Sequence, residues 1–111
     1  MTPNDLLSVI QDAWSEQTSP HWRPDMPCFG QGAVTALVIH DMFGGEIVKT
    51  EAPSGWHFYN LVEGERYDLT QDQFLEPLGY SDDPSNREEA MNAAREPCYR
   101  AMKARLKDMI G

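Results

Sequence analysis

The chain has 111 residues, enough for one domain and too few for two independent hydrophobic cores. Its 41% hydrophobic residues can form a core without disulfides or a structural metal, and two isolated cysteines offer no disulfide framework. Eighteen acidic against nine basic residues give a formal charge of −9, which disfavours nucleic acid as a partner. No apolar run approaches the roughly 18 residues of a membrane span and the N-terminus lacks a secretory pattern, so we expect a cytoplasmic protein with no membrane partner.

Capping residues and apolar spacing predict two helices in the first half of the chain. Thr2-Pro3-Asn4-Asp5 is typical of a helix start, and the apolar spacing that follows predicts a helix over residues 3–15. Residues 16–29 contain three prolines and are expected to be irregular. From Gly30 to Phe43 nearly every helical face is apolar, which predicts a buried helix ended by Gly44-Gly45.

Three strands are predicted next. Residues 46–50 alternate in polarity as strands do, and strands over 56–62 and 65–69 flank a Glu63-Gly64 turn. This hairpin is followed by helical signals.

Two capping-box patterns predict a short helical turn from Thr70 to near Pro77 and a helix from Ser85 to about Ala94. Pro97 is expected to interrupt that stretch before a last helix. The order of elements predicts a single α+β domain over residues 1–111, with a buried central helix packed on a small antiparallel sheet and a helix at the C-terminus.

The hairpin brings together an imidazole and a carboxylate. If Glu63-Gly64 is a two-residue turn, Val62 pairs with Glu65, and Asp68 lies diagonally beside His57 on one face of the sheet. Diagonal neighbours are about 7–8 Å apart at Cα, within reach of these side chains. A carboxylate there would fix the histidine tautomer. The alternative is an ordinary sheet histidine, with Asp68 leading only into the following turn.

Gly30-Gln31-Gly32 forms a glycine-rich entry to the buried helix. A thiol at such a helix start would be acidified by the helix dipole and a nearby histidine, and the backbone amides would be available to an oxyanion. Cys28 lies four residues upstream of Gly32, but free cysteines are usually small buried hydrophobes. Glycine at position 32 would let a ligand approach the backbone closely.

These segments resemble the small bacterial YunG-like proteins and, more distantly, the transglutaminase and papain-like cysteine folds. Four segments match: Trp14-Ser15 with Thr18; residues 27–31 with 33–38; Asp41 with residues 44–47; and residues 57–60 with 68–70 and Gln73-Phe74. The family pattern has Gly-Gln-Cys at the start of the helix, where this chain has glycine at position 32. The resemblance implies a transglutaminase/papain-like fold in which His57 and Asp68 are the catalytic histidine and acid and Gly32 is a degenerate nucleophile position.

The leading interpretation is a domain without catalytic activity that binds a protein or small-molecule ligand beside His57, Asp68 and residues 30–32, with no cofactor. An active cysteine hydrolase or acyl transferase would need Cys28, or a thiol in place of Gly32. A third interpretation is an acidic inhibitor or immunity-type protein whose charged surface meets a basic partner. The histidines and cysteines show no metal-ligand spacing, so no metal site is expected.

Overall fold

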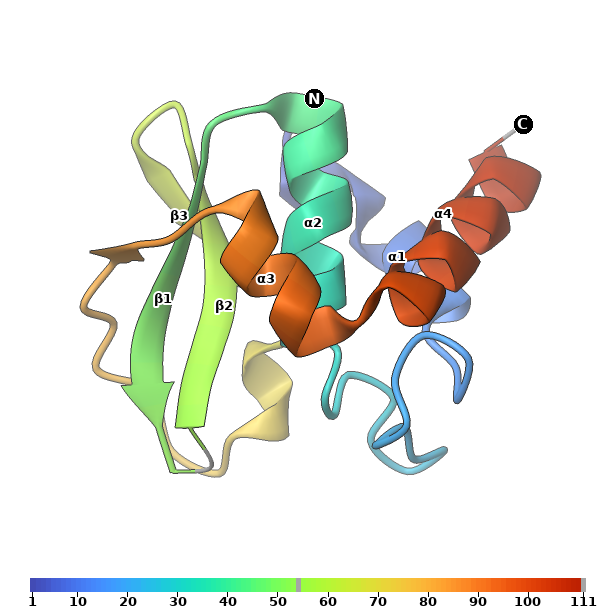
Figure 1. Cartoon of the computed structure of the whole chain (residues 1–111), viewed down its shortest axis with the longest axis horizontal. Helices are drawn as coiled ribbons and strands as arrows, with labels where there is room; N and C mark the ends of the chain where they lie inside the picture. Colours follow the sequence, from blue (N-terminus) through green and yellow to red (C-terminus); the bar gives the residue numbers. More distant parts are fainter. Residues whose placement is uncertain (54, 111) are drawn as a thin grey trace.

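An antiparallel sheet forms one side of the molecule and helices cover one of its faces (Figure 1). The computed structural model describes residues 1–53 and 55–110, and over these residues the sheet has four strands in the order β3-β2-β1-β4. The strands are β1 (Glu46–Ala52), β2 (Gly55–Val62), β3 (Glu65–Tyr67) and β4 (Asp83–Pro84). The α+β class with a small antiparallel sheet is therefore confirmed.

The central helix, α2, lies between the sheet and the remaining helices (Figure 1). The other helical elements are the 3-10 turn η1 (Pro3–Leu6), α1 (Leu7–Ala13), the 3-10 turn η2 (Gln71–Gln73), α3 (Arg87–Ala94) and the C-terminal α4 (Glu96–Ile110). Helix α2 spans Gly32–Phe43 and packs on β2 along one side and on α3 and α4 along the other. Within the described part of the chain, every helix is too short or too polar to cross a membrane.

Helix α2 is buried because its side chains are apolar on nearly all faces, as the sequence predicts. Val34, Leu37 and Ile39 are each at most 1% exposed, and burying such side chains stabilises the fold by roughly 1.5–3 kcal/mol apiece. The buried hydroxyl of Thr35 on α2 has a hydrogen-bond partner, because the Trp14 indole donates to Thr35 Oγ1 at 2.9 Å. The helix is therefore held on both sides, which fixes the position of its first turn.

The N-terminal helices differ from the prediction at their ends. The expected helix over 3–15 is a 3-10 turn followed by α1, which ends at Ala13 because Trp14 has an extended backbone. Helix α2 begins at Gly32 rather than Gly30, since Gly30 has a φ of +76°, a conformation that no helical residue adopts. The predicted helix boundaries were wrong here, although both helices exist.

The second half of the chain also departs from the expected boundaries. The third strand ends at Tyr67 and the short turn ends at Gln73. The cap of α3 is Asn86, whose side chain accepts from the Glu89 amide at 2.8 Å, so the predicted capping box from Ser85 is wrong by one residue.

Pro97 does not interrupt a helix. It lies in the first turn of α4, where its missing N–H costs nothing, and the break before it falls at Arg95, which has a φ of +74°. Strand β4, which pairs with β1 at Val48 and Lys49, was not predicted.

The glycine pair after α2 provides a matched test of the helix-to-strand connection. Gly44 and Gly45 both have positive φ (72° and 75°), but a Cβ would meet nothing within 4 Å at Gly44 and would lie 2.3 Å from Leu61 O at Gly45. Gly44→Ala should cost only backbone strain, on the order of 1–3 kcal/mol. Gly45→Ala should cost clearly more because β2 must also move. Urea unfolding of both variants measures the difference, and equal midpoints would contradict the close approach.

Candidate functional site

His57 and Asp68 meet on the hairpin formed by β2 and β3. The predicted register is present, with Val62 opposite Glu65. The ladder ends at Tyr67, and the next residue turns its carboxylate onto the histidine, so that Asp68 Oδ2 lies 2.7 Å from His57 Nε2. The predicted contact between imidazole and carboxylate is therefore observed.

The Asp68 carboxylate is surrounded by hydrogen-bond donors. Oδ1 accepts from the amide and the hydroxyl of Thr70, both at 3.1 Å, and Oδ2 also accepts from the Tyr80 hydroxyl at 2.7 Å. Burial alone would raise the pKa of Asp68, but the hydrogen bond and charge of His57, together with Tyr80 and Thr70, hold that pKa below its ordinary value. Asp68 is thus a buried carboxylate in its charged form.

The charged carboxylate determines which nitrogen of His57 carries a proton. An ionised carboxylate can only accept, so Nε2 carries the hydrogen and donates it to Asp68. The other nitrogen, Nδ1, faces the start of α2: a Cβ built on Gly32 would lie 3.0 Å from Nδ1 and 3.1 Å from Cε1. In the neutral ring, Nδ1 therefore presents its lone pair toward position 32.

The short third strand is what allows the helix start to reach this histidine. Strand β3 pairs with β2 only from Asn60 to Val62, so it does not extend alongside His57 and Phe58. The first turn of α2 lies there instead, with the Cβ position of Gly32 3.4 Å from Phe58 O. Gly32 is itself buried.

Aromatic rings enclose the pair. The His57 ring stacks on Tyr59 at 5.9 Å between centroids, and the Phe74 ring meets it edge-on at 4.8 Å. As a result, His57 and Asp68 are only 6% and 9% exposed. Their electrostatic interaction is stronger in this poorly solvated setting than it would be in water.

The loop that carries Tyr80 is fastened to the sheet on both sides of that residue. Before it, Thr50 Oγ1 donates to Gly79 O at 3.1 Å; after it, the Tyr59 hydroxyl donates to Asp82 Oδ1 at 2.8 Å. Arg66 binds the same carboxylate through two hydrogen bonds of 2.9 and 2.8 Å. These contacts hold the Tyr80 hydroxyl on Asp68. The sequence reasoning missed this loop, because a tyrosine in a loop carries no local signal of its long-range partners.

The Gly30-Gln31-Gly32 segment is divided by the structure. Gly32 is the first residue of α2, and Gly30 lies just before the helix. The Gly30 amide donates to Gln73 Oε1 at 3.2 Å. The Gln31 side chain is fully buried, accepting from Thr18 at 2.8 Å and donating to Ser15 O at 3.3 Å. Gln31 therefore anchors the preceding loop, and its side chain is not free to contact a ligand in this conformation.

Cys28 is placed as a packing residue. Its side chain is 5% exposed within the larger hydrophobic cluster, and its Sγ lies 3.6 Å from Met26 Sδ. Burial raises the pKa of the Cys28 thiol, and the negative charges of Asp72 and Asp68 raise it further. Both effects reduce the thiolate fraction, so Cys28 has the properties of an unreactive thiol.

Comparison with known proteins places this sequence in a family. The sequence profile described as "YunG protein" matches residues 2–111. A Bacillus subtilis (strain 168) protein named "Uncharacterized protein YunG" is 43% identical over 95 residues, which cover 86% of this chain and 83% of that protein. No solved structure matches the chain.

Over the residues described, no three His, Cys, Asp or Glu side chains are grouped as a metal ion would require.

The buried carboxylate makes a specific prediction about pH. Because the pKa of Asp68 is lower in the folded than in the unfolded chain, its stabilisation is complete above the ordinary value of 3.8 and is lost as the pH falls through the lower folded-state value. Asp68→Asn should cost about 1.5–3 kcal/mol at pH 6, with a smaller difference from wild type below about pH 4. Urea unfolding from pH 2.5 to 6 measures this. Asp108→Asn, at an exposed carboxylate on α4, is the control, and a pH-independent cost of Asp68→Asn would contradict the assignment.

Proposed function

The chain belongs to the YunG family, and from this membership and the geometry around Gly32 we propose that its site is a cysteine acyl-transfer site without a nucleophile, used for binding. The proposed ligand is a protein or a small molecule held beside His57 and Asp68. We place this module in the cytoplasm, where free cysteines such as Cys28 and Cys98 remain reduced.

The orientation of His57 is the observation that carries this proposal. Cysteine acyl-transfer enzymes need a thiol at hydrogen-bond distance from one histidine nitrogen, with an acid or amide on the other nitrogen. Here Nε2 is bonded to Asp68 at 2.7 Å, and Nδ1 lies 3.0 Å from where a side chain at position 32 would begin. Two of the three required groups are in place, and the third position is glycine.

The arrangement of elements supports a transglutaminase/papain-like relationship. In our proposal, α2 is the helix that carries the nucleophile position, β2 provides the histidine, and the acid follows β3 directly. Convergent positioning of these groups by a buried helix and an antiparallel hairpin is what such chemistry requires, whatever the connections between the elements.

Binding without catalysis follows from the side chains that are present. Gly32 provides no nucleophile, and Cys28 is buried with a raised pKa and a sulfur contact to Met26. The helix start still offers backbone N–H groups and a positive dipole end, whereas the free Nδ1 of His57 can only accept a hydrogen bond from a donor on the ligand. The helix N–H groups can therefore hold a carbonyl or carboxylate without cleaving it.

The substitution Gly32→Cys tests whether the site is an acyl-transfer site at all. The introduced thiol would lie beside Nδ1 once the His57 ring moves by a few tenths of an ångström. Its pKa should fall well below the ordinary value of about 8.5, and at pH 6 it should react with iodoacetamide about tenfold faster than Cys28. Peptide mapping by mass spectrometry after labelling from pH 5 to 9 assigns the rate to each thiol.

Two controls separate the histidine from the helix dipole. Ala33→Cys places a thiol on the same first turn of α2 at the adjacent position and should label slowly at pH 6. Adding His57→Ala to Gly32→Cys should remove the fast low-pH reaction. A thiol at position 32 that labels no faster than the one at 33, or that ignores the loss of His57, would rule out the proposed site. Rapid, His57-dependent labelling of Cys28 in the wild-type chain would instead favour an active enzyme.

A further inference from the structure

A hollow of about 420 Å³ lies beside the buried pair, between η2 and the loop that follows it. We call it the 71–80 hollow. Its lining residues are Gln71, Asp72, Phe74, Leu75, Glu76, Pro77, Leu78 and Tyr80. It is large enough for an amino-acid side chain with its adjoining backbone.

The hollow shares two walls with the candidate site. Phe74 lines the hollow and meets the His57 ring edge-on at 4.8 Å, and Tyr80 lines it while donating to Asp68 at 2.7 Å. The buried pair itself is closed to solvent, so the hollow is the adjoining open space that a ligand can enter. A molecule bound there would touch side chains in direct contact with both His57 and Asp68.

The charge of the hollow is negative. Asp72 and Glu76 are exposed carboxylates, none of the lining residues is a lysine or arginine, and neither carboxylate makes an ion pair with a described residue. The whole chain carries a formal charge of −9, so the field at the hollow attracts cations.

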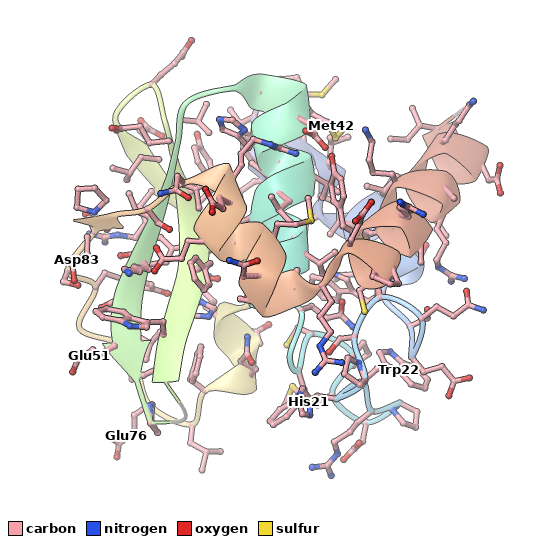
Figure 2. The ribbon with its side chains drawn as sticks, viewed as in Figure 1. His21, Trp22, Met42, Glu51, Glu76 and Asp83 are labelled. Carbon is pink, nitrogen blue, oxygen red and sulfur yellow. The ribbon has the colours of Figure 1, made fainter. Side chains whose placement is uncertain are left out.

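The rim of the hollow is apolar. Leu75 is fully exposed, and Phe74, Pro77 and Leu78 continue the apolar surface into the hollow. Figure 2 places Glu76 at the end of the molecule where β1 ends and β2 begins, which is also where η2 lies in Figure 1. An exposed apolar rim beside unpaired carboxylates fits a ligand with an apolar part next to a cation.

We infer that the 71–80 hollow binds a basic peptide segment of a partner protein, with a lysine or arginine side chain at Asp72 and Glu76 and a neighbouring apolar side chain on Leu75. This inference rests on the proposed function and names the ligand class of that site. The peptide backbone beside these side chains lies against Phe74, on the side of the hollow next to His57. An acidic or uncharged peptide lacks the complementary charge and binds more weakly.

The test uses the full chain and a pair of peptides that differ in one charge. Acetyl-Leu-Arg-amide carries the cation, and acetyl-Leu-citrulline-amide replaces it with a neutral group of nearly the same shape. Titration of each into ¹⁵N-labelled protein at low ionic strength should give saturable shifts with the arginine peptide, confined to residues 71–80 and to His57. The affinity should fall as salt is added, because the carboxylates are exposed.

Matched variants test whether Asp72 and Glu76 are the carboxylates that bind the arginine side chain. Asp72→Asn and Glu76→Gln should each weaken binding of the arginine peptide about two- to fivefold, and together about tenfold. Asp108→Asn removes an exposed charge on α4 and should leave the affinity unchanged.

Three results overturn the inference: equal affinity for the two peptides, no saturable binding of the arginine peptide at millimolar concentration, or shifts outside the hollow that survive the double variant. The proposed function is judged separately by the Gly32→Cys thiol. A fast thiol with no peptide binding rejects the basic ligand alone, whereas a slow thiol rejects the acyl-transfer site and leaves the peptide data to describe a separate binding surface.

Discussion

The hydrogen bond between His57 and Asp68 organises the surrounding structure. Removing a carboxylate from water costs several kcal/mol unless hydrogen bonds replace the lost solvation. Asp68 therefore recruits donors from β2, from Thr70 in the turn after β3, and from Tyr80 in the loop before β4. The need to satisfy one buried charge thus holds together segments that are far apart in the chain.

The same bond fixes the orientation of the His57 ring. With Nε2 held by Asp68, the ring of His57 has one remaining polar atom, and the backbone directs it to the first turn of α2. Glycine at position 32 lets the ring lie directly over the helix start, at 3.0 Å from where a Cβ would be. A side chain there would require the ring to move by a few tenths of an ångström. A ligand would approach the pair from the side of Phe74 and Tyr80, which line the adjoining hollow.

The parts of this arrangement that the sequence predicts are those governed by local periodicity. The two-residue alternation of strands and the Glu63-Gly64 turn are enough to bring Asp68 to His57, and the apolar faces of α2 are enough to bury it. The cap of α3 was misplaced because Ser85 and Asn86 are both capping residues with a glutamate three positions later. The pairing of β4 with β1 and the hydrogen bond from Tyr80 to Asp68 are long-range contacts, which no local sequence pattern encodes.

The hairpin alone favours a histidine that only packs in a sheet, and the energetics of burial argue for the other interpretation. An apolar pair of similar size at a buried ionic site is often as stable as the charged pair, or more so. If the hairpin needed only well-packed side chains, an apolar pair would therefore make the fold about as stable as the ionised carboxylate with its four donors. Such a fold would also have no need for an Nδ1 that faces a helix start. A buried carboxylate that orients an imidazole is instead what a recognition or catalytic site requires. In this chain the pair lies at a helix start whose first residue, Gly32, has no side chain, which is why we propose a role in binding for it.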